Sequence, residues 1–132
     1  MLSLLLQAAS ISLPTHKNDP RGFWLGCIGI REDGAKVTAR NGAVEFQSTI
    51  DKHQLFNYAH AEGRVLRKLG KGGVLFVARV SRKDKSLAMA RPCDMCRLKL
   101  KMNKVSKVYY TINDNQYGVW YVKDDYDRVY TV

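Results

Sequence analysis

Two short motifs combine residues that bind metals and move protons: His60-Ala61-Glu62 and Pro92-Cys93-Asp94-Met95-Cys96. Each stands where a helix is expected to begin, and the positive dipole end of a helix favours the thiolate form of a cysteine. One imidazole and two thiolates are ligands that suit zinc, and three protein ligands leave a fourth position open, as in catalytic zinc sites. The motifs therefore predict one catalytic Zn²⁺ bound by His60, Cys93 and Cys96.

Glu62 follows His60 at a distance of two residues, so it can lie beside the metal without binding it. A carboxylate in that position can take a proton from a zinc-activated water and deliver it to a substrate. We predict Glu62 as the catalytic proton shuttle.

Two other interpretations of the cysteine pair stay open at this point. It could be a redox pair, or half of a structural zinc site whose fourth ligand would have to be Cys27, His16 or His53. Cys27 lies in an apolar run and is expected to be core, since cysteine is among the most buried residue types.

The chain has 132 residues and 45% hydrophobic residues, which predicts one globular domain over residues 1–132. Apolar periodicity and turn residues predict an α/β protein with three layers and one mixed five-stranded sheet that has helices on both faces. The expected helices span Leu2 to about Ser10, 60–69 and 93–103, and the expected strands span 23–30, 36–39, 74–80, 105–112 and 117–122.

The last two expected strands are separated by about four turn residues, Asn113 to Gln116. A parallel pair needs a crossover of a dozen residues or more, so these strands should form an antiparallel hairpin. Alternation along the last strand places Trp120 and Tyr121 on opposite faces of the sheet.

The two motifs and the order of elements resemble the cytidine deaminase-like superfamily of zinc-dependent nucleobase deaminases, whose signature is His-x-Glu followed by Pro-Cys-x-x-Cys. The resemblance implies hydrolytic deamination of a base with release of ammonia. It also implies base contacts from Ala61 and from Pro92-Cys93, and a sugar contact from Asn41. The antiparallel C-terminal hairpin resembles the branch that acts on cytosine.

The charge favours a polymeric substrate. The net charge is +10, and residues 63–107 hold 14 Lys and Arg against two acids. A basic field of this kind attracts polyanions. Free cytidine deaminases usually carry Cys in place of His60. We therefore predict deamination of cytosine in nucleic acid, preferably single-stranded DNA, with RNA possible. The expected contacts are Trp24, Tyr117 and Asn113 to bases, and Arg21, Arg64, Arg91 and Arg97 to phosphates.

Two alternatives remain open. One is a deaminase of free cytidine, deoxycytidine or a nucleotide, and the other is a non-catalytic zinc or nucleic-acid binding protein, for which Glu62 would have no use. Three cysteines without a disulfide framework favour the cytoplasm. We also expect no membrane segment, a monomer, and an origin in a phage or mobile element.

Overall fold

The computed structural model describes residues 2–14, 21, 24–41 and 61–132, and only the backbone of residues 61–63. The helices within these residues are α1 (Leu2–Ser12), α3 (Ala61–Leu69) and α4 (Asp94–Met102). The strands are β1 (Trp24–Ile30), β2 (Lys36–Arg40), β3 (Val74–Val80), β4 (Leu87–Ala88), β5 (Lys107–Asn113), β6 (Gln116–Tyr121) and β7 (Tyr126–Thr131). None of the described helices is long and apolar enough to cross a membrane.

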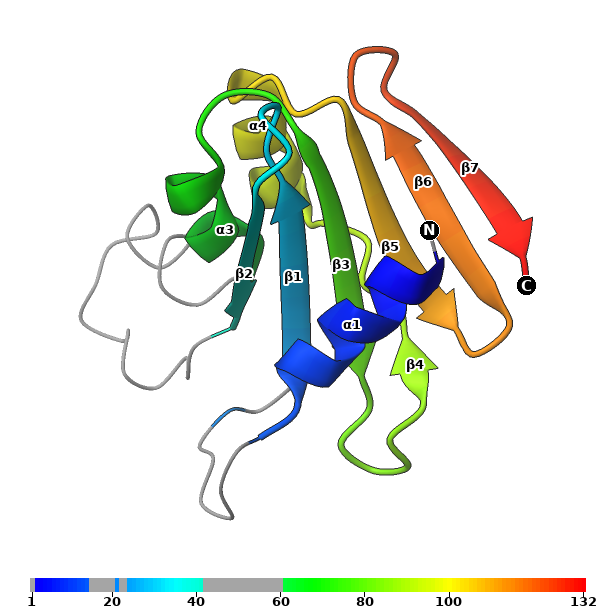
Figure 1. The fold of residues 1–132 in the computed structure, drawn as a ribbon. Coiled ribbons are helices and arrows are strands. Elements are labelled where there is room, and N and C mark those ends of the chain that lie inside the picture. Colours follow the sequence, from blue (N-terminus) through cyan, green and yellow to red (C-terminus); the bar gives the residue numbers. More distant parts are fainter. Residues whose placement is uncertain (1, 15–20, 22–23, 42–60) are drawn as a thin grey trace.

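The strands form one mixed sheet in the order β2-β1-β3-β5-β6-β7, with β4 paired to β3 (Figure 1). β3 and β5 are parallel, and the other neighbouring pairs are antiparallel. The predicted hairpin is confirmed, since β6 runs antiparallel to β5.

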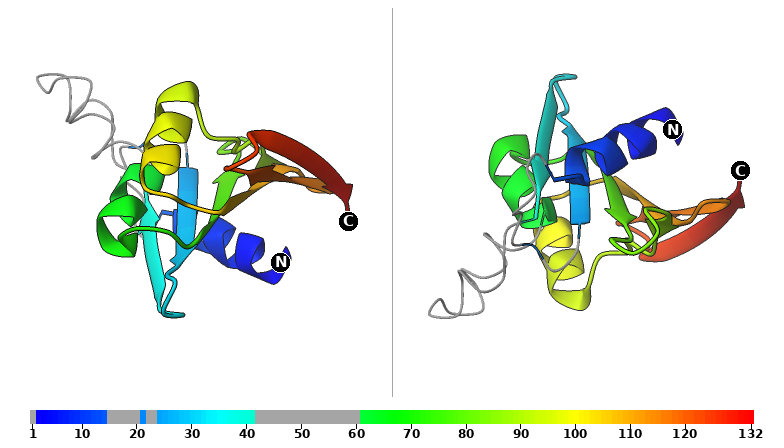
Figure 2. Two further views of the ribbon diagram at one scale, coloured as in Figure 1. Left: turned by 90° about the horizontal axis from the view of Figure 1, so that it is seen from above. Right: turned by 90° about the horizontal axis from the view of Figure 1, so that it is seen from below.

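Alternation along the strands divides the core into two layers. Trp24, Ile28 and Phe76 pack against α1 on one face, whereas Leu25, Cys27 and Val77 pack with α3 and α4 on the other. Figure 2 shows α1 on one side of the sheet and the other two helices opposite. The three-layer α/β fold is therefore confirmed, as is the expectation that Cys27 is buried core.

Trp120 and Tyr121 lie on opposite faces, as predicted. The helix α1 lies directly on β1, and Gly26 permits this close approach. A Cβ added to Gly26 would collide with the backbone oxygen of Ala8.

The predicted strand number was wrong, because the described residues form a sheet of seven strands instead of five. One added strand, β4, has only two residues and lies in the basic segment that precedes Pro92. The other, β7, is an edge strand that mixes charged, aromatic and apolar residues, with most side chains exposed. Neither strand has the continuous apolar run that marks β1, β3 and β5, and edge strands lack that signal because they bury little.

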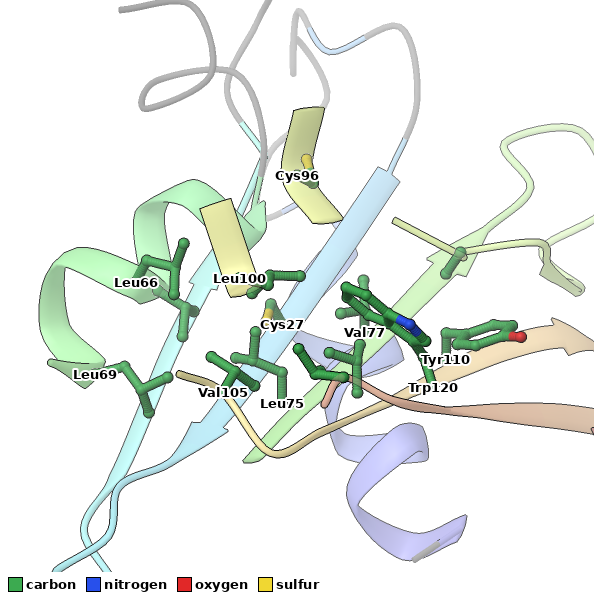
Figure 3. Packing of buried hydrophobic residues seen from close by; sticks show 14 of the residues in the cluster. Cys27, Leu66, Leu69, Leu75, Val77, Cys96, Leu100, Val105, Tyr110 and Trp120 are labelled. Carbon is green, nitrogen blue, oxygen red and sulfur yellow. The ribbon is translucent and has the colours of Figure 1, made fainter. Parts of the chain in front are cut away.

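The apolar residues of α4 divide between solvent and core. Met95, Leu98 and Met102 lie on its outer side and are 41%, 59% and 65% exposed. Cys96 and Leu100 instead face the sheet and are fully buried (Figure 3). Residues four apart share a helix face, so this pair determines which side of the helix packs inward.

Candidate active site

The helices α3 and α4 begin at the same end of the sheet. Each precedes one of the parallel strands β3 and β5, and their other ends are joined by a hydrogen bond from the Gly72 N–H to the Asn103 carbonyl oxygen, 2.8 Å long. The two helix starts therefore lie at the end where β2, β3 and β5 finish, which we call the carboxyl end of the sheet. The second motif and the part of the first that the structure describes, Ala61-Glu62, lie at this end.

Cys93 is the N-cap residue of α4, and Cys96 lies within its first turn. Cys93 is exposed and Cys96 is fully buried. The Cys93 thiol points to the Cys96 sulfur at 3.3 Å, which is much longer than a disulfide bond of about 2.05 Å. The pair thus lies across the boundary between core and solvent.

The two sulfurs fit a zinc site. Two thiolates at about 2.3 Å from a tetrahedral zinc lie about 3.8 Å apart, close to the observed separation. The other predicted ligand, His60, lies outside the described residues, as do His16 and His53. Ala61 begins α3, and for Glu62 the backbone alone is described, in the first turn of the same helix. Cys93 and Cys96 are therefore the part of the predicted ligand set that the structure places.

Asn41 lies at the end of β2 and is only 1% exposed. Its side-chain oxygen accepts hydrogen bonds from the Leu25 N–H at 2.9 Å and from Arg21 Nη1 at 3.1 Å. Asn41 is thus at the predicted end of the sheet, with its amide oxygen used to join β1 and β2.

Three arginines converge beside Asn41: Arg21, Arg40 and Arg64, which we call the arginine cluster. Arg21 is only 4% exposed, and Arg64 donates from Nη1 to the Arg40 carbonyl oxygen at 3.2 Å. Burial lowers the pKa of Arg64, and the positive charges of Arg21 and Arg40 lower it further. The cluster therefore concentrates positive charge beside the first turn of α3, where Arg64 lies close in sequence to Glu62.

Pro92 is buried directly before the cysteines, and the chain leading to it is held to β5 by Thr111. The Thr111 hydroxyl donates to the Ala88 carbonyl oxygen at 2.7 Å, and the Ala90 N–H donates to the Thr111 carbonyl oxygen at 2.9 Å. Asn113 lies at the same end of β5, where its side chain bonds Gln116 and the Asn115 N–H within the turn.

Two predicted base contacts lie on the wrong face of the sheet. Trp24 is 9% exposed and packs in the core beneath α1, and Tyr117 packs against the same core and stacks on Tyr130. Both belong to the carboxyl end, but strand alternation turns them away from α3 and α4. Their expected role in stacking a base beside the zinc is therefore not supported.

Two of the predicted phosphate contacts, Arg91 and Arg97, form ion pairs with acids of the same chain. Asp127 binds Arg91 through two hydrogen bonds of 2.9 and 3.0 Å, and Asp125 lies 2.7 Å from Arg97. The acidic C-terminal stretch folds back onto the basic segment that surrounds the cysteines. Of the four arginines predicted to contact phosphates, Arg91 and Arg97 are thus paired with acids, whereas Arg21 and Arg64 belong to the arginine cluster.

Asp127 is held by several groups. The Arg91 guanidinium lowers the pKa of Asp127, and the Tyr110 hydroxyl also donates to it. Burial, followed by this hydrogen bond, raises the pKa of Tyr110 to about 12. A carboxyl whose pKa is lowered on folding stabilises the protein above its unfolded pKa of about 3.9, and this contribution is lost as the pH falls through the folded value.

Thr111, Asp125 and Asp127 bind the segments on either side of the cysteines, and the sequence did not predict these contacts. The available signal was in the C-terminal stretch, where a strand-forming segment, residues 126–131, contains Asp127 and follows a turn that contains Asp125. A hairpin predicted there would have brought the acids back towards the preceding strands.

The comparisons with known proteins identify the family. The family model described as the cytidine and deoxycytidylate deaminase zinc-binding region matches residues 3–112, which extend from α1 into β5. No curated protein matches the chain. The matched region includes both motifs, the helices α3 and α4 and the strands from β1 into β5. The protein therefore belongs to the family of zinc-dependent cytidine and deoxycytidylate deaminases.

Proposed function

We propose that the protein deaminates cytosine to uracil in single-stranded nucleic acid, with DNA as the preferred polymer. Membership of the deaminase family supports zinc-dependent deamination of a cytidine-type substrate. The polymer is supported by the arginine cluster, since cations that follow phosphates give the affinity for a strand.

In this proposal, His60, Cys93 and Cys96 would hold the zinc, which would supply Lewis-acid activation of water. Glu62 would move one proton of that water to the ring nitrogen and the other to the departing amino group, so that cytosine and water give uracil and ammonia. The exposure of Cys93 fits a role as ligand of a catalytic zinc, because both the water and the base must reach the metal from the solvent. The backbone N–H groups of Ala61 and Cys93 orient the base.

The arginine cluster carries the choice of substrate. Arg64 is in the first turn of α3 and Arg40 ends β2, so a phosphate beside the sugar would meet the guanidinium of Arg64 and the positive field of Arg40 and of the buried Arg21. A neutral nucleoside gains nothing from such charge, whereas a nucleotide within a strand gains attraction at each phosphate. An unpaired strand is the easier polymer, because its base need not be extracted from a duplex.

A second candidate is a single nucleotide such as deoxycytidylate. It is favoured by the same cluster, which could take one phosphate, and by the internal pairing of Arg91 and Arg97. A monophosphate and a strand share the chemistry of the phosphate group but differ in the number of groups bound.

The zinc-loaded protein should convert cytosine to uracil in a single-stranded oligodeoxynucleotide faster than in deoxycytidine, deoxycytidylate or the matched duplex. Each substrate is incubated at equal cytosine concentration, and uracil is measured by mass spectrometry. Activity on deoxycytidylate alone would show that the substrate is the free nucleotide and not a strand. Inactivity on all of these would contradict the proposed function.

Arg64→Gln should weaken oligonucleotide binding, raising KM by about tenfold, which corresponds to about 1.4 kcal/mol, with little change in kcat. The slope of log KM against log salt should fall by about one, as expected for the loss of one phosphate contact. Arg67→Gln is the matched control, because Arg67 is an exposed residue in the last turn of the same helix. An equal effect of both variants would point to general charge instead of a site.

A further inference from the structure

The β6–β7 hairpin forms ion pairs on both sides of the segment that contains the cysteines. Asp127 binds Arg91, two residues before Cys93, with Nε to Oδ2 at 3.0 Å and Nη2 to Oδ1 at 2.9 Å. Asp125 binds Arg97, directly after Cys96, at 2.7 Å. The segment Arg91–Arg97, which we call the cysteine segment, is therefore tied to the hairpin at its two ends.

Buried aromatic residues hold the two acids in place. The Tyr110 hydroxyl donates to Asp127 at 2.7 Å, and the Trp120 indole N–H donates to Asp125 at 3.0 Å. Trp120 is fully buried, and the Arg97 guanidinium lies over its ring at 4.6 Å from the centroid. The acids thus connect the cysteine segment to the buried cluster that contains Cys96, Trp120 and Tyr110 (Figure 3).

We propose that Asp125 and Asp127 are positioning residues that hold the cysteine segment so that Cys93 and Cys96 keep the geometry required by zinc. The proposal rests on the assignment of these cysteines as zinc ligands within the proposed function. Both acids lie beyond residue 112, where the match to the family model ends, so the hairpin adds this support to the matched deaminase region.

The local structure explains why the segment needs such support. The first turn of a helix lacks intrahelical partners for its N–H groups, and Cys93 has no side-chain hydrogen bond that caps α4. Cys93 is also exposed, so apolar packing contributes little to fixing its side chain. Metal ligands must be held to within about 0.5 Å, and outer groups that orient them affect metal affinity.

Asp127→Asn should raise the zinc dissociation constant by about tenfold, at the lower end of the range for residues that support ligands. Zinc affinity is measured on the full chain by competition with a chromophoric chelator. The cobalt-substituted protein should show weaker thiolate-to-cobalt absorption, a signature that a loss of stability alone would not change. Asp124→Asn, which makes the same charge change at an exposed residue of the turn before β7, should leave both quantities unaltered.

Arg91→Gln tests the same ion pair from a side chain that is 40% exposed, so this variant should fold even if Asp127→Asn does not. It should also raise the zinc dissociation constant by about tenfold. The double variant should resemble either single variant instead of reaching about a hundredfold, because the two residues act as one unit.

The wild-type protein and Cys93→Ser separate this inference from the proposed function. If the wild type binds one zinc that Cys93→Ser removes, the site stands. Unchanged zinc affinity and cobalt spectrum in both Asp127→Asn and Arg91→Gln would then overturn the positioning role alone. If the wild type binds no zinc, the ligand assignment fails, and the positioning role fails with it.

Discussion

Glu62→Gln should lower kcat for cytosine deamination by a factor of about 10²–10⁴, the range expected when a general acid–base group is removed. The amide has nearly the volume of the carboxylate but cannot accept the proton of the attacking water. Zinc content should stay at one ion per chain, because Glu62 is predicted to lie beside the metal and not to bind it. The rate is measured on the oligonucleotide or nucleotide that the wild type converts fastest.

The matched control is Glu32→Gln, an exposed residue in the turn between β1 and β2, at the opposite end of the sheet. It makes the same chemical change and should retain full activity. A Glu62→Gln variant with normal zinc content and undiminished kcat would contradict the proton-shuttle role. Loss of zinc together with activity would instead make Glu62 a ligand.

Cys93→Ser should remove bound zinc and bring deamination below detection. A serine hydroxyl is a poor zinc ligand near neutral pH, whereas the thiolate is favoured at the start of α4. Because Cys93 is exposed, the change loses little apolar packing, and its effect on stability should come from the metal. With zinc present at about 1,000 times its dissociation constant, that loss is about 4 kcal/mol.

The third cysteine provides the control for this experiment. Cys27 is fully buried between β1 and the helices α3 and α4, so Cys27→Ala should lower the free energy of unfolding but retain one zinc per chain. Zinc is measured by elemental analysis and stability by denaturant unfolding with and without added zinc. Retention of zinc by Cys93→Ser, or its loss from Cys27→Ala, would contradict the proposed ligand set.

The fold could be predicted where burial left a pattern. The apolar runs of β1 and β3 are buried on both faces, and the short link between β5 and β6 permits only an antiparallel pair. The hairpin strand β7 could not be recognised in that way. It lies at the edge, exposes most of its side chains, and is stabilised by contacts to residues distant in sequence.

The candidate site was predicted from residue types, and the structure changed the parts that depend on direction. Pro92, Cys93 and Asn41 come to the carboxyl end of the sheet because the order of strands and helices requires it. Trp24 and Tyr117 also reach that end but lie on the α1 face. Nothing in their residue types distinguishes a base-stacking ring from one in the core.

By itself the sequence determined the deaminase motifs, the family and the three-layer fold, since these depend on spacing and on local burial. It also determined the net charge, but only the tertiary structure decided where that charge can act. The hairpin brings Asp125 and Asp127 onto Arg97 and Arg91, while Arg21 and Arg64 gather beside Asn41. Ion pairs between residues so far apart in sequence form only when the fold brings them together, because the energy of a charge depends on the groups near it in space.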